Sequence, residues 1–298
     1  MTPSHHRSSE PTRNGATKGA LPVPGAIAFI GGGNVARSMI GGLVALGTPA
    51  SCIRVSEPDD HLRAALCRDF GVLAHPSNHG AVAQADLWVL AVKPQVLRGV
   101  CEELAATARE ARPLVVTLAA GIPIAAVERW LGAGDEPLSI VRAMPNTPAL
   151  LGESATALCA NAQVSAIERQ HAQALFEAVG IALWIADEDL MDTVTATSGS
   201  GPAYVFAMVE AMQAAAVAQG LPEEVARALI AQTIVGAGRM LVDSGEDAAT
   251  LRRRVTSPGG VTAEALRRFA EGGFEALVAE GIAAATARGA ELAAQYGA

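Results

Sequence analysis

The chain has 298 residues, of which half are hydrophobic and 17% are charged, and this composition is typical of a soluble globular protein with a substantial core. The formal net charge of −8, the lack of a basic stripe and an aromatic content of only 4% exclude a nucleic-acid-binding function. The four cysteines stand far apart without a C-x-x-C pair, which argues against a metal site and suits the reducing cytoplasm. No stretch is a convincing membrane span, and residues 1–24 are expected to form a disordered tail.

The first predicted element is a buried strand at Ala26–Ile30, which runs through the turn Gly31–Ala36 into a helix. This is the G-x-G-x-x-A pattern of a dinucleotide-binding turn, in the strand–turn–helix context that it requires. Gly31 allows the tight turn, Gly33 lets a pyrophosphate approach the backbone, and Ala36 lets the helix pack on the strand. The sequence therefore predicts a dinucleotide cofactor at this turn.

The second predicted strand, Cys52–Ser56, ends where this type of site contacts the adenosine ribose. Ser56 suits the 2′-phosphate of NADP, whereas the acidic residues that follow, Glu57, Asp59 and Asp60, would repel it. These acids also suit the start of the next helix, as its cap. The local sequence leaves NAD and NADP both open.

Strands and helices continue to alternate. Further strands are predicted at Val72–Ala74, Leu87–Val92, Leu114–Leu118, Ser139–Ala143, Ala155–Leu158 and Ala182–Ile185, and helices at Asp59–Phe70, Pro94–Ala108, Ile124–Leu131 and Val164–Val179. This alternation predicts a parallel, doubly wound sheet that binds its ligands at the carboxyl ends of the strands. Lys93, Gly121 and Asn146 follow three of the strands and are expected to border one cleft.

A composition shift at Ala186–Asp189 marks the predicted domain boundary, with a dinucleotide-binding domain at 25–187 and a helical domain at 188–298. The helices are predicted at Leu190–Thr197, Pro202–Gln219, Pro222–Ser244, Asp247–Arg254, Thr262–Ala270 and Phe274–Gln295. Pro202–Gln219 and Leu229–Leu241 are apolar nearly all round, and so small a domain has too little interior to bury both. We therefore predict that subunits associate through this domain.

The segment Val255–Thr262 indicates a loop that opens a helix. Gly259 and Gly260 let a ligand approach the backbone, Ser257 and Thr262 supply hydroxyls, and the N–H groups of a helix start attract an anion such as a carboxylate. A glycine turn with a hydroxyl cap is the alternative interpretation. Together with the glycine turn, the segment favours a nicotinamide-dependent oxidoreductase with an anion pocket and no metal.

With these motifs in order, the sequence resembles the pyrroline-5-carboxylate reductase family from about Gly25 to Gly289. The motifs that carry the resemblance are Phe29–Asn34, Ala91–Pro94, Ala119–Gly121, Arg142–Pro148, Ser198–Tyr204 and Val255–Thr262. The resemblance implies a Rossmann domain followed by an all-α dimerisation domain, in a homodimer that is often assembled as five dimers. It also implies reduction of L-1-pyrroline-5-carboxylate to L-proline, the last step of proline biosynthesis, with hydride from NADPH or alternatively NADH.

The resemblance further implies a role for each matching residue. The pyrophosphate would contact Gly31, Gly33, Asn34 and Val35, and the adenosine side would face Ser56 and Asn78. The nicotinamide ribose would border Ala91, Lys93 and Pro94. The nicotinamide ring would lie near Ala119, Ala120, Met144, Pro145 and Asn146. The substrate carboxylate would be held by Ser257, Pro258, Gly259, Gly260, Val261 and Thr262. Thr262 would lie near the imine nitrogen, as proton donor or as the group that positions it.

Two places depart from the family pattern. Val261 stands where the family often has a second threonine, so contact with a carboxylate there must come from the backbone. Asp247–Ala249 replaces a His-Pro-Gly segment, which leaves the role of that loop open. The alternatives to the implied function are an enzyme for another cyclic imine or a hydroxy acid, and a cofactor-binding protein without turnover. The lack of any lysine after Lys93 argues against a lysine-based hydroxy-acid enzyme.

Overall fold

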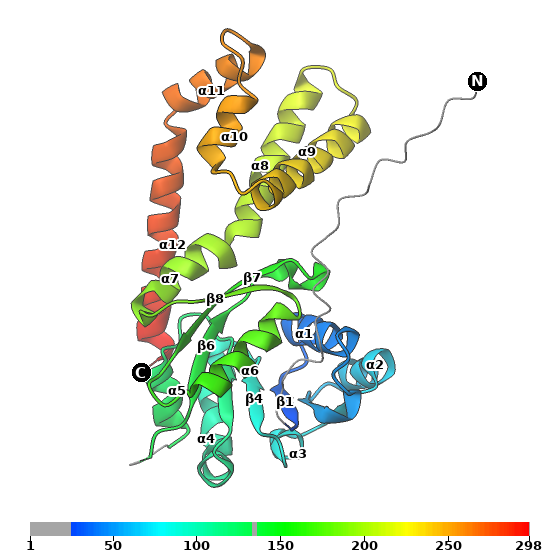
Figure 1. Ribbon diagram of the computed structural model, residues 1–298, viewed down its shortest axis with the longest axis vertical. Helices are drawn as coiled ribbons and strands as arrows, with labels where there is room; N and C mark the ends of the chain where they lie inside the picture. Colours follow the sequence, from blue (N-terminus) through cyan, green and yellow to red (C-terminus); the bar gives the residue numbers. More distant parts are fainter. Residues whose placement is uncertain (1–24, 133–135, 298) are drawn as a thin grey trace, which may run out of the picture.

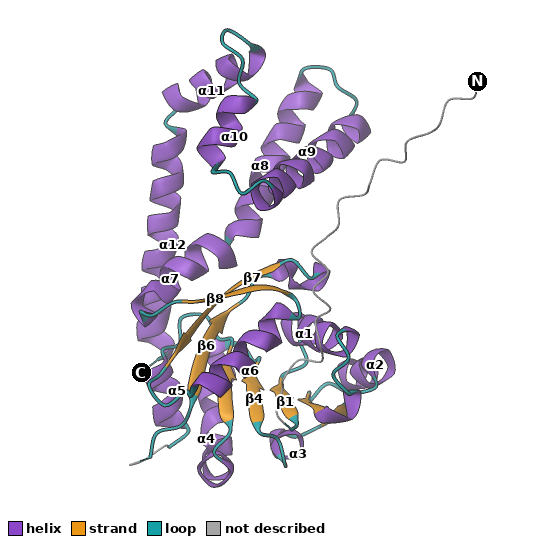
Figure 2. Ribbon diagram, viewed as in Figure 1, coloured by secondary structure: helices purple, strands orange, loops and turns teal. Residues whose placement is uncertain are grey.

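The computed structural model describes residues 25–132 and 136–297, so the predicted tail at 1–24 lies outside the described residues. An α/β half comes first in the chain, and a helical half follows it and extends away from the sheet (Figure 1). Figure 2 shows the same division, with all the strands gathered in one half and only helices and loops in the other. The predicted fold class is confirmed.

The first half is built on one sheet of eight strands. In chain order they are β1 (Ile27–Ile30), β2 (Ile53–Ser56), β3 (Leu73–His75), β4 (Leu87–Leu90), β5 (Leu114–Thr117), β6 (Ile140–Met144), β7 (Ser154–Ala160) and β8 (Gly180–Trp184). Their order across the sheet is β3-β2-β1-β4-β5-β6-β7-β8, and neighbouring strands are parallel at every pair except β6 and β7. The order reverses between β1 and β4, which is the switch point where doubly wound sheets bind ligands.

The antiparallel pairing of β7 with β6 corrects the prediction of a wholly parallel sheet. The link between these strands, residues 145–153, contains only a 3-10 turn at Thr147–Leu151. A parallel pair needs a crossover of a dozen or more residues, usually with a helix, and this short link therefore returns the chain in the opposite direction.

Helices cover both faces of the sheet, because its central strands are apolar on both sides. Along β1, Ile27 and Phe29 join the core on one face, and Ala28 and Ile30 join the core on the other. The helices of this half are α1 (Asn34–Ala45), α2 (Asp60–Phe70), α3 (Asn78–Val82), α4 (Pro94–Ala111), α5 (Ile124–Trp130) and α6 (Ala166–Glu177). The first core is closed by α1, α2 and α6, and the second by α3, α4 and α5.

The predicted elements of this half are all present, with ends that differ by a few residues. Sequence reasoning missed α3, which is a short helix capped by Ser77. Helix α2 begins one residue later than predicted, because Asp59 is its cap and accepts hydrogen bonds from the backbone N–H groups of His61 and Leu62.

The second half is helical throughout its described residues. Its helices are α7 (Met191–Val194), α8 (Gly201–Ala218), α9 (Glu223–Asp243), α10 (Ala248–Arg254), α11 (Val261–Glu271) and α12 (Phe274–Tyr296). The single helix predicted over Leu190–Thr197 was wrong in detail, because α7 is short and one π-helical turn, Thr195–Gly199, joins it to α8. Pro202 lies in the first turn of α8 as predicted, whereas Pro222 is the N-cap of α9.

Helices α8 and α9 leave their apolar surface exposed in the single chain. No residue of α8 is buried, and only Ala226 and Ile230 of α9 are. Phe206 and Leu229 are 64% and 57% exposed. Helix α9 is long and apolar enough to cross a membrane, but a single helix of this kind is only weak evidence for a membrane span. An apolar surface of this extent marks a binding face.

Candidate active site

The loops that follow β2, β1, β4 and β5 emerge at one edge of the sheet. Ile30, the last residue of β1, is in register with Ser56 of β2 and with Leu90 of β4, and Leu90 is in register with Thr117 of β5. Strands that end level with one another bring their following loops side by side. The structure thus gathers the predicted cofactor residues of the first half along this edge.

The glycine turn after β1 has the geometry of a dinucleotide cradle. Gly31 has a φ of 101°, and a Cβ atom there would stand 2.8 Å from the carbonyl oxygen of Ala91. At Gly33 a Cβ atom would meet nothing within 4 Å, so the space in front of this residue is open to a ligand. Gly33 is also the N-cap of α1, and no side chain caps that helix. Its first N–H groups, from Asn34 and Val35 onward, suit a pyrophosphate.

Glu57 stabilises the glycine turn through a hydrogen bond, a role that was not predicted from the sequence. Its buried carboxylate accepts hydrogen bonds from the backbone N–H of Gly32 at 3.0 Å and from that of Asp59 at 3.0 Å. Glu57 comes directly after β2, which ends level with β1 and therefore beside the glycine turn. In the sequence, only this position could have indicated its role. Both carboxylate oxygens are engaged with backbone donors, so Glu57 is not directed at the adenosine side.

The other two acids after β2 are engaged as well. The N–H group of Leu62, and then that of His61, hold the pKa of Asp59 below its ordinary value, because each donates to the charged carboxylate. Asp60 forms an ion pair with Arg63 of the same helix. The interpretation of these residues as the start of a helix is therefore confirmed.

Ser56 and Asn78, which were both predicted to face the adenosine side, are in contact. Ser56 is a buried residue, and its hydroxyl donates to the Oδ1 atom of Asn78 at 2.6 Å. Asn78 is the first residue of α3 and in turn donates through Nδ2 to the carboxylate of Glu103, on α4, at 2.8 Å. Glu103 was not singled out from the sequence, because it lies on an ordinary amphipathic helix.

The loops after β4 and β5 border the same edge. The backbone N–H of Ala91 donates to the carbonyl of Ile30, and Pro94 begins α4, with the exposed Lys93 as its N-cap. Ala119 is buried, and its N–H donates to the hydroxyl of Thr117. These bonds fix the loops that contain Ala91, Lys93, Pro94, Ala119 and Ala120.

Asn146 ties the loop after β6 to the start of the helical half. Its Oδ1 accepts from the hydroxyl of Ser154 and from the backbone N–H of Ala155, and its Nδ2 donates to the carbonyl of Ser198. The amide oxygen thus accepts two hydrogen bonds and the amide nitrogen donates one, which leaves a single side-chain N–H for a ligand. Met144, two residues earlier, lies beside the π-helical turn, where a Cβ atom on Gly199 would stand 2.7 Å from its Cε.

A buried arginine joins the two halves next to this loop. Arg142 of β6 is 4% exposed and pairs with Glu188 and with Asp192, each at 3.2 Å. Glu188 also accepts from the backbone N–H of Ile124, at the start of α5. The end of α12 packs nearby, where a Cβ atom on Gly121 would stand 3.3 Å from Leu292.

Removing this arginine is expected to destabilise the protein strongly. We expect Arg142→Ala to lower the free energy of unfolding by about 3 kcal/mol, because it leaves two largely buried carboxylates without a partner. Arg227→Ala is the control, since its ion pair with Glu223 is exposed and is worth less than about 1 kcal/mol. Urea unfolding of both variants checks the difference, and equal losses would contradict a structural role for Arg142.

The predicted substrate loop lies at the far end of the helical half. Gly259 has a φ of 70°, the N–H of Gly260 donates to the carbonyl of Ser257, and Gly260 is the N-cap of α11 without any side-chain cap. Val261 is 91% exposed. The loop opens a helix, as predicted, but within one chain it stands well away from the cofactor edge (Figure 1).

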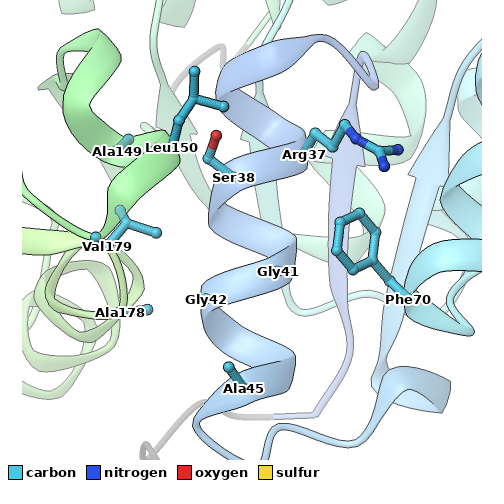
Figure 3. A pocket seen from close by; sticks show the side chains of 11 residues that line it. Arg37, Ser38, Gly41, Gly42, Ala45, Phe70, Ala149, Leu150, Ala178 and Val179 are labelled. Carbon is cyan, nitrogen blue, oxygen red and sulfur yellow. The ribbon is translucent and has the colours of Figure 1, made fainter.

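A surface pocket of about 350 Å³ lies along the flank of α1 rather than at the cofactor edge. In Figure 3 its side chains come from α1, from the end of α2, and from the segments around Ala149 and Ala178. Arg37, its charged residue, stacks on Phe70 and forms an ion pair with Asp69. Because Arg37 is already engaged, the pocket offers a ligand mainly apolar contacts. It is also separate from the predicted cofactor site.

The part of the chain that the structure describes holds no group of His, Cys, Asp or Glu residues that could bind a metal ion. Burial raises the pKa of the Cys101 thiol to about 12 and also raises that of Cys159. Both thiols are therefore neutral and unreactive at physiological pH.

A doubly wound sheet with a glycine-rich turn at its switch point and an uncapped helix behind the turn is typical of dinucleotide-dependent oxidoreductases. Residues 26–121 match the family model described as NADP oxidoreductase coenzyme F420-dependent, and residues 188–292 match the one described as pyrroline-5-carboxylate reductase dimerisation. A pyrroline-5-carboxylate reductase of Pseudomonas aeruginosa is 51% identical over 271 residues, which cover 91% of this chain and 98% of the relative. One of Vibrio alginolyticus is 43% identical over 267 residues, covering 89% and 97%.

Solved structures agree with these relatives. The pyrroline-5-carboxylate reductase of Coxiella burnetii superposes with a TM-score of 0.85 at 39% identity, covering 90% of this chain and 98% of the other. The Plasmodium falciparum enzyme, solved with NADP bound, has a TM-score of 0.79 at 27% identity, covering 92% and 100%. The chain belongs to the pyrroline-5-carboxylate reductase family.

Proposed function

We infer that the protein reduces L-1-pyrroline-5-carboxylate to L-proline with hydride from NAD(P)H. The observation that carries this inference is similarity along nearly the whole chain to reductases of this one name. The glycine turn and the uncapped start of α11 support it, since they suit the two anionic groups involved, the cofactor's pyrophosphate and the substrate's carboxylate.

The residues at the cofactor edge fit a dinucleotide. The open space at Gly33 and the uncapped start of α1, at Asn34 and Val35, support a pyrophosphate there, next to the tight turn at Gly31. The adenosine side of the cofactor then lies against Ser56 and Asn78. The nicotinamide ribose lies against the loop after β4, at Ala91, Lys93 and Pro94. The nicotinamide ring lies near the loops at the ends of β5 and β6, at Ala119, Ala120, Met144, Pro145 and Asn146. When bound, the nicotinamide supplies the hydride that reduces the C=N carbon.

The substrate loop Ser257–Thr262 completes the site of a second subunit. Its separation from the cofactor edge within one chain supports this arrangement, because hydride transfer requires the two to be in contact (Figure 1). The exposed apolar faces of α8 and α9 support a dimer that carries the loop across. We place the domain boundary after Asp187, and we propose that dimers assemble further, up to five per particle.

The loop binds and orients the substrate. The backbone N–H groups at the start of α11, from Val261 onward, and the hydroxyl of Ser257 hold the carboxylate, while Pro258, Gly259 and Gly260 keep side chains out of its way. The half-buried Thr262 places its hydroxyl by the imine nitrogen, where it donates or relays the proton that hydride addition requires. The exposed Val261 contributes only its backbone.

We propose that the protein works in the cytoplasm and that α9 contacts a second subunit rather than a membrane. The four cysteines are free thiols, which suits a reducing compartment. The match of residues 188–292, which include α9, to a dimerisation family supports a protein partner for this helix.

Dimerisation gives a direct test of this arrangement. Leu229→Arg places a charge on the exposed apolar face of α9, and we expect it to give monomers and to lower activity more than about 100-fold, because each site then lacks its substrate loop. Leu73→Arg is the control, since Leu73 is also exposed but lies on edge strand β3. Sedimentation velocity checks the mass of each variant, and an active monomer would contradict a shared site.

The reaction itself is tested by following NADPH and NADH oxidation with L-1-pyrroline-5-carboxylate, with chiral analysis of the proline formed. Rapid oxidation with L-proline as product is the expected result. Binding of the cofactor without oxidation would favour a different imine as substrate and make Val261 the first residue to exchange for threonine.

A further inference from the structure

We propose that Glu103 is a positioning residue that fixes the orientation of Asn78 and thereby disfavours a phosphate on the adenosine ribose of the cofactor. The inference rests on the proposed function in one respect, because it takes the adenosine side of the cofactor to lie against Ser56 and Asn78. It concerns a residue that touches neither the cofactor nor the substrate.

Three elements contribute to one chain of hydrogen bonds. Ser56 ends β2, Asn78 begins α3, and Glu103 lies in the middle of α4. The Ser56 Oγ to Asn78 Oδ1 distance is 2.6 Å, and the Asn78 Nδ2 to Glu103 Oε2 distance is 2.8 Å. The buried serine is thus linked through one amide group to a carboxylate at the surface.

Hydrogen-bond chemistry fixes the direction of this chain. An ionised carboxylate only accepts, so Glu103 must face the NH₂ side of the Asn78 amide, and the amide oxygen then faces Ser56. An amide oxygen also only accepts, so the single hydroxyl hydrogen of Ser56 is directed at Asn78. Ser56 offers lone pairs to a ligand, and the remaining amide hydrogen of Asn78 lies on the nitrogen bound to Glu103.

This arrangement distinguishes the two cofactors. A ribose 2′-hydroxyl can donate to the lone pairs of Ser56, whereas the oxygens of a 2′-phosphate need donors. To bind a phosphate, Ser56 must release Asn78, and the amide oxygen then loses its partner. The bond from Asn78 to Glu103 prevents the amide from turning to present its NH₂ group in place of the oxygen.

The charges nearby act in the same direction. The Glu103 side chain is 41% exposed, and the Nε2 atom of His79 lies 3.8 Å from its carboxylate. Glu57 is held by backbone N–H groups. Arg63 is engaged with Asp60 and with the carbonyls of Glu57 and Pro58. A phosphate next to Ser56 therefore meets the lone pairs of Ser56 and of the Asn78 amide oxygen, and the negative charge of Glu103.

The test compares cofactor affinities, measured by titrating the intact protein with NADPH and with NADH in the absence of substrate. Glu103→Gln keeps an acceptor for Asn78 but removes the charge, and we expect it to lower the Kd of NADPH roughly fivefold while that of NADH changes less than about twofold. Glu103→Ala also frees the amide to turn, and we expect at least as large a shift toward NADPH. The kcat at saturating cofactor should not change.

Glu102→Gln is the matched control. Glu102 is the preceding residue of α4 and pairs with Arg98 on the same helix, so the variant loses the same charge without touching Asn78. An unchanged ratio of the two Kd values in both Glu103 variants, or an equal change in Glu102→Gln, would overturn the proposal. Because the titration needs no substrate, a shifted ratio without proline formation would refute the proposed reaction and leave this inference intact.

Discussion

Thr262→Ala is expected to lower kcat for proline formation by about 100-fold or more, which is the usual effect of removing a group that transfers or positions a proton. Thr262 lies in the first turn of α11, directly behind the glycines of the proposed carboxylate loop. The variant should leave the Kd of NADPH unchanged, because the proposed cofactor contacts all come from the sheet loops and Thr262 is proposed to contact only the substrate. Steady-state kinetics and a cofactor titration check the two halves of this prediction.

Two companion variants separate the chemistry from the fold. Thr256→Ala is the control, since the Thr256 hydroxyl donates to the carbonyl of Arg252 and lies outside the proposed carboxylate loop. Thr262→Ser keeps a hydroxyl and should retain most of the turnover. If Thr262→Ala and Thr256→Ala have similar kcat values, Thr262 has no part in the proton transfer.

Gly33→Val is expected to raise the Kd of NADPH by about 100-fold or more, because the side chain fills the space through which a pyrophosphate reaches the backbone. The backbone at Gly33 has a φ of −68° and a ψ of −176°, which valine adopts readily, and a Cβ atom there meets nothing within 4 Å. The protein should therefore fold normally. This position tolerates a side chain in the absence of a ligand and excludes one in its presence.

The comparison variant is Gly99→Val. Gly99 lies on α4, and a Cβ atom there also meets nothing within 4 Å, so the two variants add the same side chain to open space. Titration with NADPH and thermal unfolding of both proteins check the prediction. Normal NADPH binding by a folded Gly33→Val protein would remove the pyrophosphate from this turn.

Local patterns in the sequence were sufficient for most elements and for the position of the turn. Glycines in a strand–turn–helix context predicted the cradle at Gly31–Gly33, and the structure adds its geometric reasons, the φ of Gly31 and the open space at Gly33. The direction of β7 was not predicted, because a strand's own residues do not record which neighbour it will pair with or in which sense.

The polar contacts of the site were the least predictable part. Ser56 and Asn78 are 22 positions apart in the sequence, and Asn78 and Glu103 are 25 apart. Residues so distant meet only when strand register and helix packing are both set. The sequence left open whether the acids after β2 repel a ribose phosphate or begin the next helix, and it did not indicate that Glu57 binds the glycine turn.

The sequence by itself determined the fold class, the glycine turn and the loop that opens α11, because hydrophobic period, glycine and proline act on the chain locally. It also determined that α8 and α9 need a partner, since both are apolar around most of their circumference. Only the tertiary structure decided that Glu57 accepts from the glycine turn, that Asn78 donates to Glu103, and that the proposed substrate loop lies far from the glycine turn of its own chain. These outcomes depend on which elements pack together. Packing is set by burial of the whole apolar core and not by any local sequence pattern.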